Sequence, residues 1–194
     1  MSSTMSLDIK RRSATTTPAP SARGAYAGEV AKLIDVSKCI GCKACEVQCR
    51  SLHNGGPGAF FCRVLSVEQT EPKPALGFVY TSCFHCENPW CVKACPTGAM
   101  RRRHDGIVFV EKSLCVGCKA CITACPWAAP QWNAQTGKVD KCDLCRDRID
   151  QGLKPACVTT CAMSCLQFTT PDTASQEKRQ GFAEQIQRSR PVGL

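Results

Sequence analysis

Residues 115–126 read CVGCKACITACP, so cysteines recur at positions 115, 118, 121 and 125 and a proline follows the last one. A Cys-x2-Cys-x2-Cys-x3-Cys-Pro run is typical of chains that bind 4Fe-4S clusters, in which three thiolates hold one cluster and the fourth holds a neighbouring cluster. The three closely spaced thiols wrap one cubane, whereas the fourth lies on the following helical turn and points away. One such run therefore predicts a partner run: the last thiol of each run binds the cluster that three thiols of the other run hold.

The chain repeats this pattern with altered spacing, and the four blocks use 4 × 4 = 16 of its 18 cysteines. Block one is Cys39, Cys42, Cys45 and Cys49; block two is Cys83, Cys86, Cys91 and Cys95; block three is Cys115, Cys118, Cys121 and Cys125; block four is Cys142, Cys145, Cys157 and Cys161. Block four is stretched by residues 146–156, which we expect to form a loop. The cost of this loop is small because closure entropy grows slowly with length.

The spacing also predicts which blocks exchange ligands. Blocks two and three are close in sequence and both end in Cys-Pro, as in a bacterial two-cluster ferredoxin, so blocks one and four must pair around them. Four sets follow: set A is Cys39, Cys42, Cys45 and Cys161; set B is Cys142, Cys145, Cys157 and Cys49; set C is Cys83, Cys86, Cys91 and Cys125; set D is Cys115, Cys118, Cys121 and Cys95. We expect each set to bind one 4Fe-4S cluster, and therefore four clusters as cofactors.

Composition agrees with a fold that metal centres hold together. The 18 cysteines stand in a chain of 194 residues with only 6% aromatic residues, so there are few large side chains to bury. The formal charge of +9 suggests nucleic-acid binding, but each loaded cluster with its four thiolates adds about −2. Four clusters nearly cancel the excess, which argues against a nucleic-acid partner.

The expected fold class is α+β: two interleaved bacterial-ferredoxin-like modules with short strands, short helices and long loops, stapled by the four clusters. We expect a flexible leader at residues 1–26, a four-cluster domain at 27–172 and a helical tail for partner docking at 173–194. The inner module covers about 78–130, and the outer module covers about 30–70 plus 131–170. Apolar spacing predicts strands at 29–36 and 61–69 and a hairpin at 100–110. Short helices should follow Cys42, Cys91, Cys118 and Cys157.

Two other uses of cysteine compete with iron-sulfur binding. Zinc knuckles also use Cys-x2-Cys pairs, but they take four ligands from two pairs, whereas blocks one and three each present three tightly spaced thiols and a fourth. A disulfide framework is allowed by the even cysteine count. We disfavour it because the sequence shows no secretory signal and the Cys-x2-Cys-x2-Cys loops are too tight for several bridges.

Several residues near the blocks have a functional and a structural interpretation. Cys62 and Cys165 lie outside the four sets, and we expect both to pack in the core. His85, between Cys83 and Cys86, either donates a hydrogen bond to sulfur or packs the loop. Four lysines lie one or two residues from a cluster cysteine, namely Lys43, Lys93, Lys119 and Lys141. Their positive charge should favour the reduced, more negative state of the clusters.

Three segments carry a resemblance to a known family. They are CFHCENPWC at 83–91, CPWAAPQW at 125–132 and KCDLC at 141–145. Together with the blocks, they resemble the four-cluster iron-sulfur subunits of molybdenum and tungsten enzymes such as dimethyl sulfoxide reductase and formate dehydrogenase, over residues 30–170. The small polyferredoxin of multi-subunit tungsten aldehyde oxidoreductases is similar too. Two departures stand out: Cys118 is present where the nitrate reductase branch has Trp, and Ala162 replaces a common proline.

The resemblance implies an electron-transfer subunit without a catalytic site of its own. Its partners would be a large molybdenum- or tungsten-pterin catalytic subunit and a second redox subunit, either a flavoprotein that uses NAD or a quinone-linked protein. The alternatives are a stand-alone soluble polyferredoxin and a cluster-based sensor, although no effector domain is visible. The terminal segments suggest self-association as well. We expect no membrane span and a cytoplasmic location, or a periplasmic one by co-export with a partner.

Overall fold

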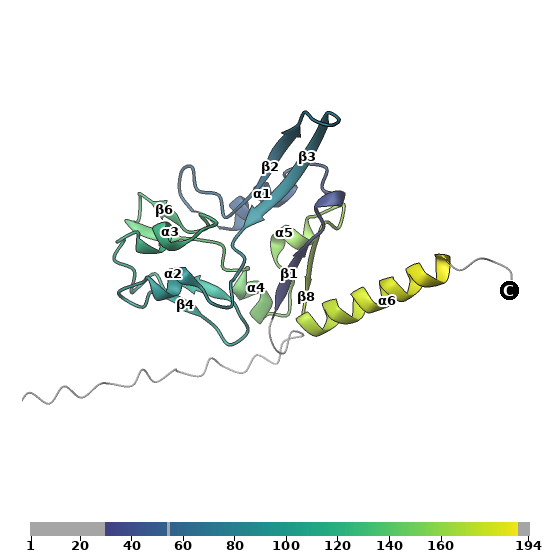
Figure 1. The fold of residues 1–194 in the computed structure, drawn as a ribbon. Coiled ribbons are helices and arrows are strands. Elements are labelled where there is room, and N and C mark those ends of the chain that lie inside the picture. The colour runs from purple at the N-terminus through teal and green to yellow at the C-terminus, as the bar shows by residue number, and fades with distance from the viewer. Residues whose placement is uncertain (1–29, 54, 190–194) are drawn as a thin grey trace, which may run out of the picture.

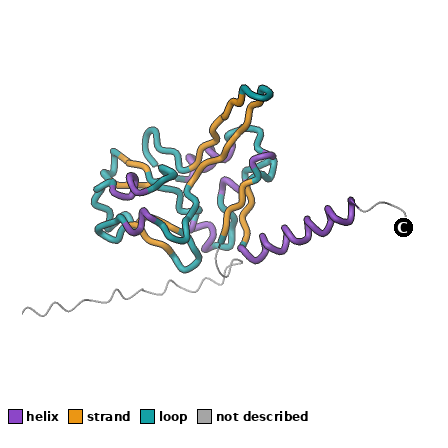
Figure 2. The backbone as a smooth tube through the Cα atoms, viewed as in Figure 1, coloured by secondary structure: helices purple, strands orange, loops and turns teal. Residues whose placement is uncertain are grey.

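The computed structural model describes residues 30–53 and 55–189, so the expected leader lies outside the described residues. Short strands and mostly short helices alternate along the chain, joined by long loops (Figures 1 and 2). The strands form four antiparallel pairs, β1 with β8, β2 with β3, β4 with β5 and β6 with β7. No described helix is both long and apolar enough to cross a membrane.

The first and last strands of the body close one half of the molecule. Strand β1 (Ala31–Ile34) pairs with β8 (Leu166–Thr169), so that segments from opposite ends of the chain lie side by side. A single 3-10 turn, η1 (Val36–Lys38), leads from β1 to the first cysteine block. Helix α1 (Ala44–Leu52) of block one packs against α5 (Ala156–Thr159) of block four. Blocks one and four are therefore neighbours in space.

The other half is built from the middle of the chain. Hairpin strands β4 (Met100–Arg102) and β5 (Val108–Val110) follow α2 (Trp90–Lys93), which packs against α3 (Ala120–Ala124). A second hairpin, β6 (Gln131–Asn133) with β7 (Lys138–Asp140), follows α3 and leads into block four. Helices of blocks two and three thus contact each other, as those of blocks one and four do.

A longer hairpin rises from the body (Figure 1). It consists of β2 (Cys62–Gln69) and β3 (Ala75–Ser82), with Val64 opposite Tyr80 in its register. Both of these side chains are buried at the base, whereas most of the hairpin further out is exposed. The base therefore anchors the hairpin in the core through its inward face, as alternation along a half-buried strand requires.

The buried core is small and rich in sulfur. One of its clusters comprises Val64, Tyr80, Leu166 and five cysteines, namely Cys45, Cys49, Cys62, Cys157 and Cys165. A second contains Cys91 and Cys121 among Met100, Val108 and Val139. Because thiols occupy so many positions where larger apolar side chains usually pack, the core depends on the state of its cysteines.

One element differs from the expectation from sequence, whereas the described part of the expected tail is helical. Residues 146–156 are not a plain loop, because they begin with the single-turn helix α4 (Arg146–Asp150). Ile149 on this helix is buried against Ile107, Leu144 and Phe168, and this packing explains why the turn forms. Helix α6 (Pro171–Ser189) extends away from the body in Figure 1, and Ala174 is its one buried residue among those described.

Candidate iron-sulfur sites

The thiols of set C line one hollow in the middle of the chain. Cys83, Cys86 and Cys91 come from block two, and Cys125 comes from the end of block three. The rest of the wall is mostly apolar, with Pro89, Pro126 and Pro130, Trp90 and Trp127, and one lysine, Lys141. The structure thus brings together four thiols in a largely dry environment, and the fourth thiol comes from the partner block.

Sets A and D have the same arrangement. The set D thiols, Cys95, Cys115, Cys118 and Cys121, line a second hollow with Met100, Val110 and Val139. The set A thiols, Cys39, Cys42, Cys45 and Cys161, line a third hollow with Val64, Tyr80 and Leu166. Cys165 also lies in the wall of the third hollow, which therefore contains five thiols. In each hollow, three thiols of one block face the last thiol of another.

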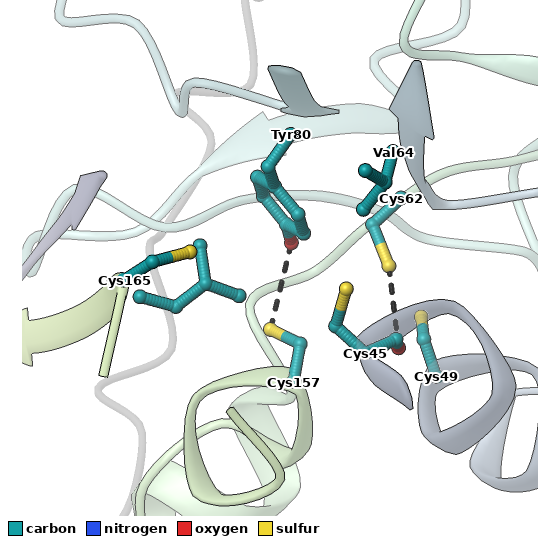
Figure 3. Packing of buried hydrophobic residues seen from close by; sticks show 8 residues of the cluster. Cys45, Cys49, Cys62, Val64, Tyr80, Cys157 and Cys165 are labelled. Atoms are coloured by element: carbon teal, nitrogen blue, oxygen red, sulfur yellow. Dashed lines mark hydrogen bonds between the residues drawn. The ribbon is translucent and has the colours of Figure 1, made fainter. Parts of the chain in front are cut away.

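Set B lies where α1 and α5 meet. Cys49 on α1 and Cys157 on α5 share one buried cluster, and Figure 3 shows Cys45 and Cys49 across from Cys157. The Tyr80 hydroxyl donates a hydrogen bond to Cys157 Sγ at 3.5 Å, and His53 Nε2 lies 3.2 Å from Cys145 Sγ. Burial raises the pKa of Cys142 and of Cys145 to about 11. These four thiols are therefore deeply placed, and two of them have a side-chain hydrogen-bonding partner.

The loops that carry the thiols share an unusual backbone. Gly41 and Gly117 occupy the same place in blocks one and three and have φ of 70° and 71°. An added Cβ would collide with the Phe78 ring at Gly41 and with the Gly137 carbonyl at Gly117. Glycine is thus needed for both the torsion and the space.

Non-glycine residues in these loops adopt the left-handed region as well. They are Lys43, His85, Lys119, Leu144 and Cys145, with φ between 49° and 64°. Each such residue costs about 1 kcal/mol or more, and strain of this kind gathers at functional sites. All four blocks therefore contain a left-handed turn close to their first thiols, which curls the chain around the space that the thiols face.

His85 provides an independent sign that a group is to be bound here. The Val108 N–H donates to His85 Nδ1 at 3.0 Å, so the proton of the neutral ring is on Nε2. Burial, and then the charges of Lys141 and Lys32, lower the pKa of His85 and keep it neutral. Among the described residues, buried Nε2 has no hydrogen-bond partner. A buried donor without a partner is rare, and an anionic sulfur acceptor would satisfy it.

The donor set fits iron-sulfur clusters. Thiolate is the usual ligand of such clusters, and each of the three hollows presents at least four cysteines. In the part of the chain that the structure describes, no three His, Cys, Asp or Glu side chains converge on a point suited to a single metal ion.

The two cysteines outside the sets are both buried. Cys62 is 3% exposed, and its Sγ donates to the Cys45 carbonyl at 3.5 Å (Figure 3). Cys165 is equally buried and lies against Cys39 and Cys161. The expectation of buried positions is confirmed for both, although Cys165 is closer to a thiol set than a plain packing role requires.

Sequence reasoning missed His53, Tyr80 and Lys32. His53 and Tyr80 contact set B thiols, and Lys32 Nζ lies 3.3 Å from the Tyr80 hydroxyl. His53 caps the C-terminus of α1, the helix that contains the last two thiols of block one, whereas Tyr80 and Lys32 are on strands β3 and β1, which are far apart in sequence. No local pattern in the sequence indicates these contacts.

Comparison with known proteins gives the same class of site. Two models described as 4Fe-4S dicluster domain match residues 75–171 and 38–99. Over 144 residues, 70% of each protein, the chain is 42% identical to the B subunit of the anaerobic dimethyl sulfoxide reductase of Escherichia coli. It is 40% identical over 183 residues to the iron-sulfur subunit of the nitrate-inducible formate dehydrogenase of the same organism, covering 84% of this chain and 62% of that one.

A further relative extends the match over most of this chain. It is the formate dehydrogenase-O iron-sulfur subunit of Escherichia coli, 38% identical over 199 residues, with 92% of this chain and 66% of the relative covered. The four-block pattern, the hollows lined by thiols and these similarities agree. The chain therefore belongs to the family of 4Fe-4S electron-transfer subunits that includes those of dimethyl sulfoxide reductases and formate dehydrogenases.

Proposed function

We propose that this chain binds four 4Fe-4S clusters, one in each of sets A to D, in two interleaved ferredoxin-like modules. The proposal rests on the residues that line the three hollows of sets A, C and D. Each hollow is lined by three thiols of one block and the last thiol of another. The contact between α1 and α5 supports the same exchange for set B. A bound 4Fe-4S cluster accepts and releases one electron at a time, and the protein supplies its position and environment.

The residues around the thiols are mostly apolar. Proline and tryptophan cover set C, and aliphatic side chains cover sets A and D. Exclusion of water and hydrogen bonds to sulfur are the means by which a protein adjusts a cluster's potential. Sets A and B share blocks one and four, and sets C and D share blocks two and three, so the clusters within each pair would lie close enough for electron transfer; Lys141, which lines the hollow of set C and bonds to Cys142 of set B, marks where the two pairs meet.

The relay would connect a catalytic subunit that contains a molybdenum or tungsten pterin with a second redox subunit, either a flavoprotein that uses NAD or a quinone-linked protein. This proposal is supported by the similar proteins, which are iron-sulfur subunits of a dimethyl sulfoxide reductase and of formate dehydrogenases. We assign the chain no catalytic step of its own. The cytoplasm is the proposed location, with co-export to the periplasm beside a partner as the alternative.

The exposed tail supports a further contact between subunits. Phe182 and Ile186 are four residues apart on α6, hence on one face, and their exposed fractions are 64% and 50%. A helix with so little packing is marginal alone in water. We propose that it docks on a neighbouring subunit and that this contact contributes to self-association.

Native purification with metal analysis tests the proposal. We expect about 16 iron atoms per chain, four for each of four clusters, together with stoichiometric molybdenum or tungsten from a copurifying large subunit. Purification of the iron-loaded chain alone, with no large subunit, would favour the stand-alone polyferredoxin. An iron content near eight, or zinc in place of iron, would contradict the four-cluster assignment.

The five thiols around set A allow a sharper test. Cys161→Ala should lower the iron content by about one cluster, because Cys161 completes the set, whereas Cys165→Ala should leave it unchanged. The two residues are four apart in one hollow and are replaced by the same small side chain, so they form a matched pair. The reverse result would give the ligand role to Cys165.

A further inference from the structure

Four lysines lie beside cluster cysteines in sequence, but the structure separates one from the rest. Lys43, Lys93 and Lys119 are exposed, whereas Lys141 is only 6% exposed. Water and salt screen an exposed charge, while a buried charge acts across a medium of low effective permittivity. Lys141 is therefore the one of the four whose charge should be felt strongly by the thiol sets.

Lys141 lies between two of the thiol sets. It lines the hollow of set C, and its Nζ donates to the carbonyl of Cys142, a set B residue, at 2.6 Å. A second hydrogen bond from Nζ goes to the Val108 carbonyl. The hollows of sets A and D also have one lysine each in their walls, Lys43 and Lys119, but both of these are exposed, whereas Lys141 is buried. Its ammonium thus marks the place where the half built from blocks two and three meets the half built from blocks one and four.

A second lysine approaches the same junction from β1. Lys32 Nζ donates to the Tyr80 hydroxyl, which in turn donates to Cys157 Sγ of set B. Lys32 also bonds to Ser82, the residue before Cys83 of set C. Burial raises the pKa of Cys142, and the charges of Lys32 and Lys141 both lower it. Two cations therefore act on one thiol at the junction.

Among the described residues, no acidic side chain forms an ion pair with either of these two cations. In the described ranges 30–53 and 55–189, lysine forms ion pairs at Lys38 with Asp35 and at Lys112 with Asp140, and none involves Lys32 or Lys141. A buried ammonium that interacts only with neutral carbonyls is costly unless an opposite charge is near. Clusters with four thiolates each, of charge about −2, would supply that charge from both sides.

From this placement, we propose that Lys141, assisted by Lys32, raises the reduction potentials of the clusters in sets B and C. The two clusters at the junction are then easier to reduce than they would be without these cations. Reduction adds a negative charge to a cluster, and a buried cation stabilises the reduced form most where it is closest. The inference rests on the ligand sets of the proposed function, and it adds which two clusters are stabilised in the reduced form by buried cations.

Redox titration of the native complex, followed by electron paramagnetic resonance, tests this role. Lys141→Gln keeps a hydrogen-bond donor but removes the charge, so two of the four midpoint potentials should fall while the other two stay in place. Lys93→Gln is the matched control: it removes the same charge from an exposed position two residues after Cys91 of set C, and it should shift no midpoint. Lys141→Arg, which keeps the charge, should restore the original pattern.

Lys32→Met tests the same proposal if the Lys141→Gln variant does not assemble. Lys32 is half-buried, and its replacement should lower the same two midpoints. The proposal is overturned if the midpoints are unchanged in Lys141→Gln or Lys32→Met, or if Lys93→Gln lowers them equally. An iron content below four clusters in the unsubstituted chain would instead contradict the ligand sets, so the two failures are distinguishable.

Discussion

Asp105 is a buried carboxylate in the turn of the β4–β5 hairpin, where it orients an arginine that reaches another element. Arg103 Nε donates to both of its oxygens at 3.1 Å, and the Ile107 N–H donates to Oδ1 at 3.2 Å. The same guanidinium bonds to Asp150 of α4 at 2.9 Å. Burial alone would raise the pKa of Asp105, but the hydrogen bonds and charge of Arg103 outweigh it and lower the pKa below 3.8.

Asp105→Asn should therefore destabilise the protein at neutral pH. We expect a loss of about 1–3 kcal/mol, because the half-buried guanidinium of Arg103 loses the more deeply buried of its two charged acceptors. Asp150→Asn is the control, since Asp150 is largely exposed and should cost less than about 1 kcal/mol. Anaerobic thermal melts of the two variants at one pH measure the difference. Equal melting temperatures for Asp105→Asn and the unsubstituted chain would contradict this role.

The lowered pKa of Asp105 also predicts how its contribution to stability changes with pH. A carboxyl whose pKa is lower in the folded state binds fewer protons there than in the unfolded state, so its contribution is complete above the unfolded pKa of about 4. The contribution disappears as the pH falls through the folded pKa. The gap in melting temperature between Asp105→Asn and the unsubstituted chain should therefore narrow towards low pH, and the difference between the two proteins removes the effect of acid on the iron.

At the scale of residues, the sequence predicts which thiols meet but not what surrounds them. Spacing alone is enough to expect Cys125 beside block two and Cys161 beside block one, and the structure places both in those hollows; their ligand role stays a prediction. The four lysines look alike in sequence because burial is a tertiary property. Likewise, His53 and Tyr80 reach set B only through the packing of distant elements.

Among the elements, those marked by local signals could be predicted and those made by tertiary packing could not. Asp105-Gly106 marks the turn of the β4–β5 hairpin, and alternation marks β2. Strand β8 has no such signal, since it exists through pairing with β1 across most of the chain. The single turn of α4 is too short to be stable alone and depends on the burial of Ile149.

The exposed apolar face of helix α6, which contains Phe182 and Ile186, leads to a prediction about assembly. If its apolar face docks on a neighbouring subunit, Phe182→Asp combined with Ile186→Asp should place two charges in that contact and reduce the mass of the native assembly, measured by light scattering. Gln176→Asp with Gln187→Asp adds the same charge at exposed polar positions of the same helix and should leave the mass unchanged. An unchanged mass in the first variant would refute the docking role of this face.

Across the whole molecule, cysteines form part of the buried core and are also the proposed cluster ligands. Five of the eight residues in one core cluster are cysteines, and the strands and helices joined by that core come from both ends of the chain. Burial raises the pKa of Cys121, Cys142 and Cys145 to about 11, so these thiols are protonated and neutral at pH 7 without metal. Binding of clusters releases these protons and cross-links the segments, and metal affinity therefore becomes folding free energy.

Removal of iron should consequently unfold the body of the protein rather than leave an empty scaffold. An iron(II) chelator with a reductant, applied anaerobically, should abolish the visible absorbance and the far-ultraviolet circular dichroism together and open residues 30–170 to proteolysis. Both halves should be lost, because the small apolar cores of each are lined by cluster cysteines. Treatment with EDTA alone serves as the control: it extracts exposed zinc but should leave buried clusters and the fold intact. A colourless, iron-free chain that still resists protease would show that the core suffices without metal, and the view of this fold as four cross-linked thiol sets would be wrong.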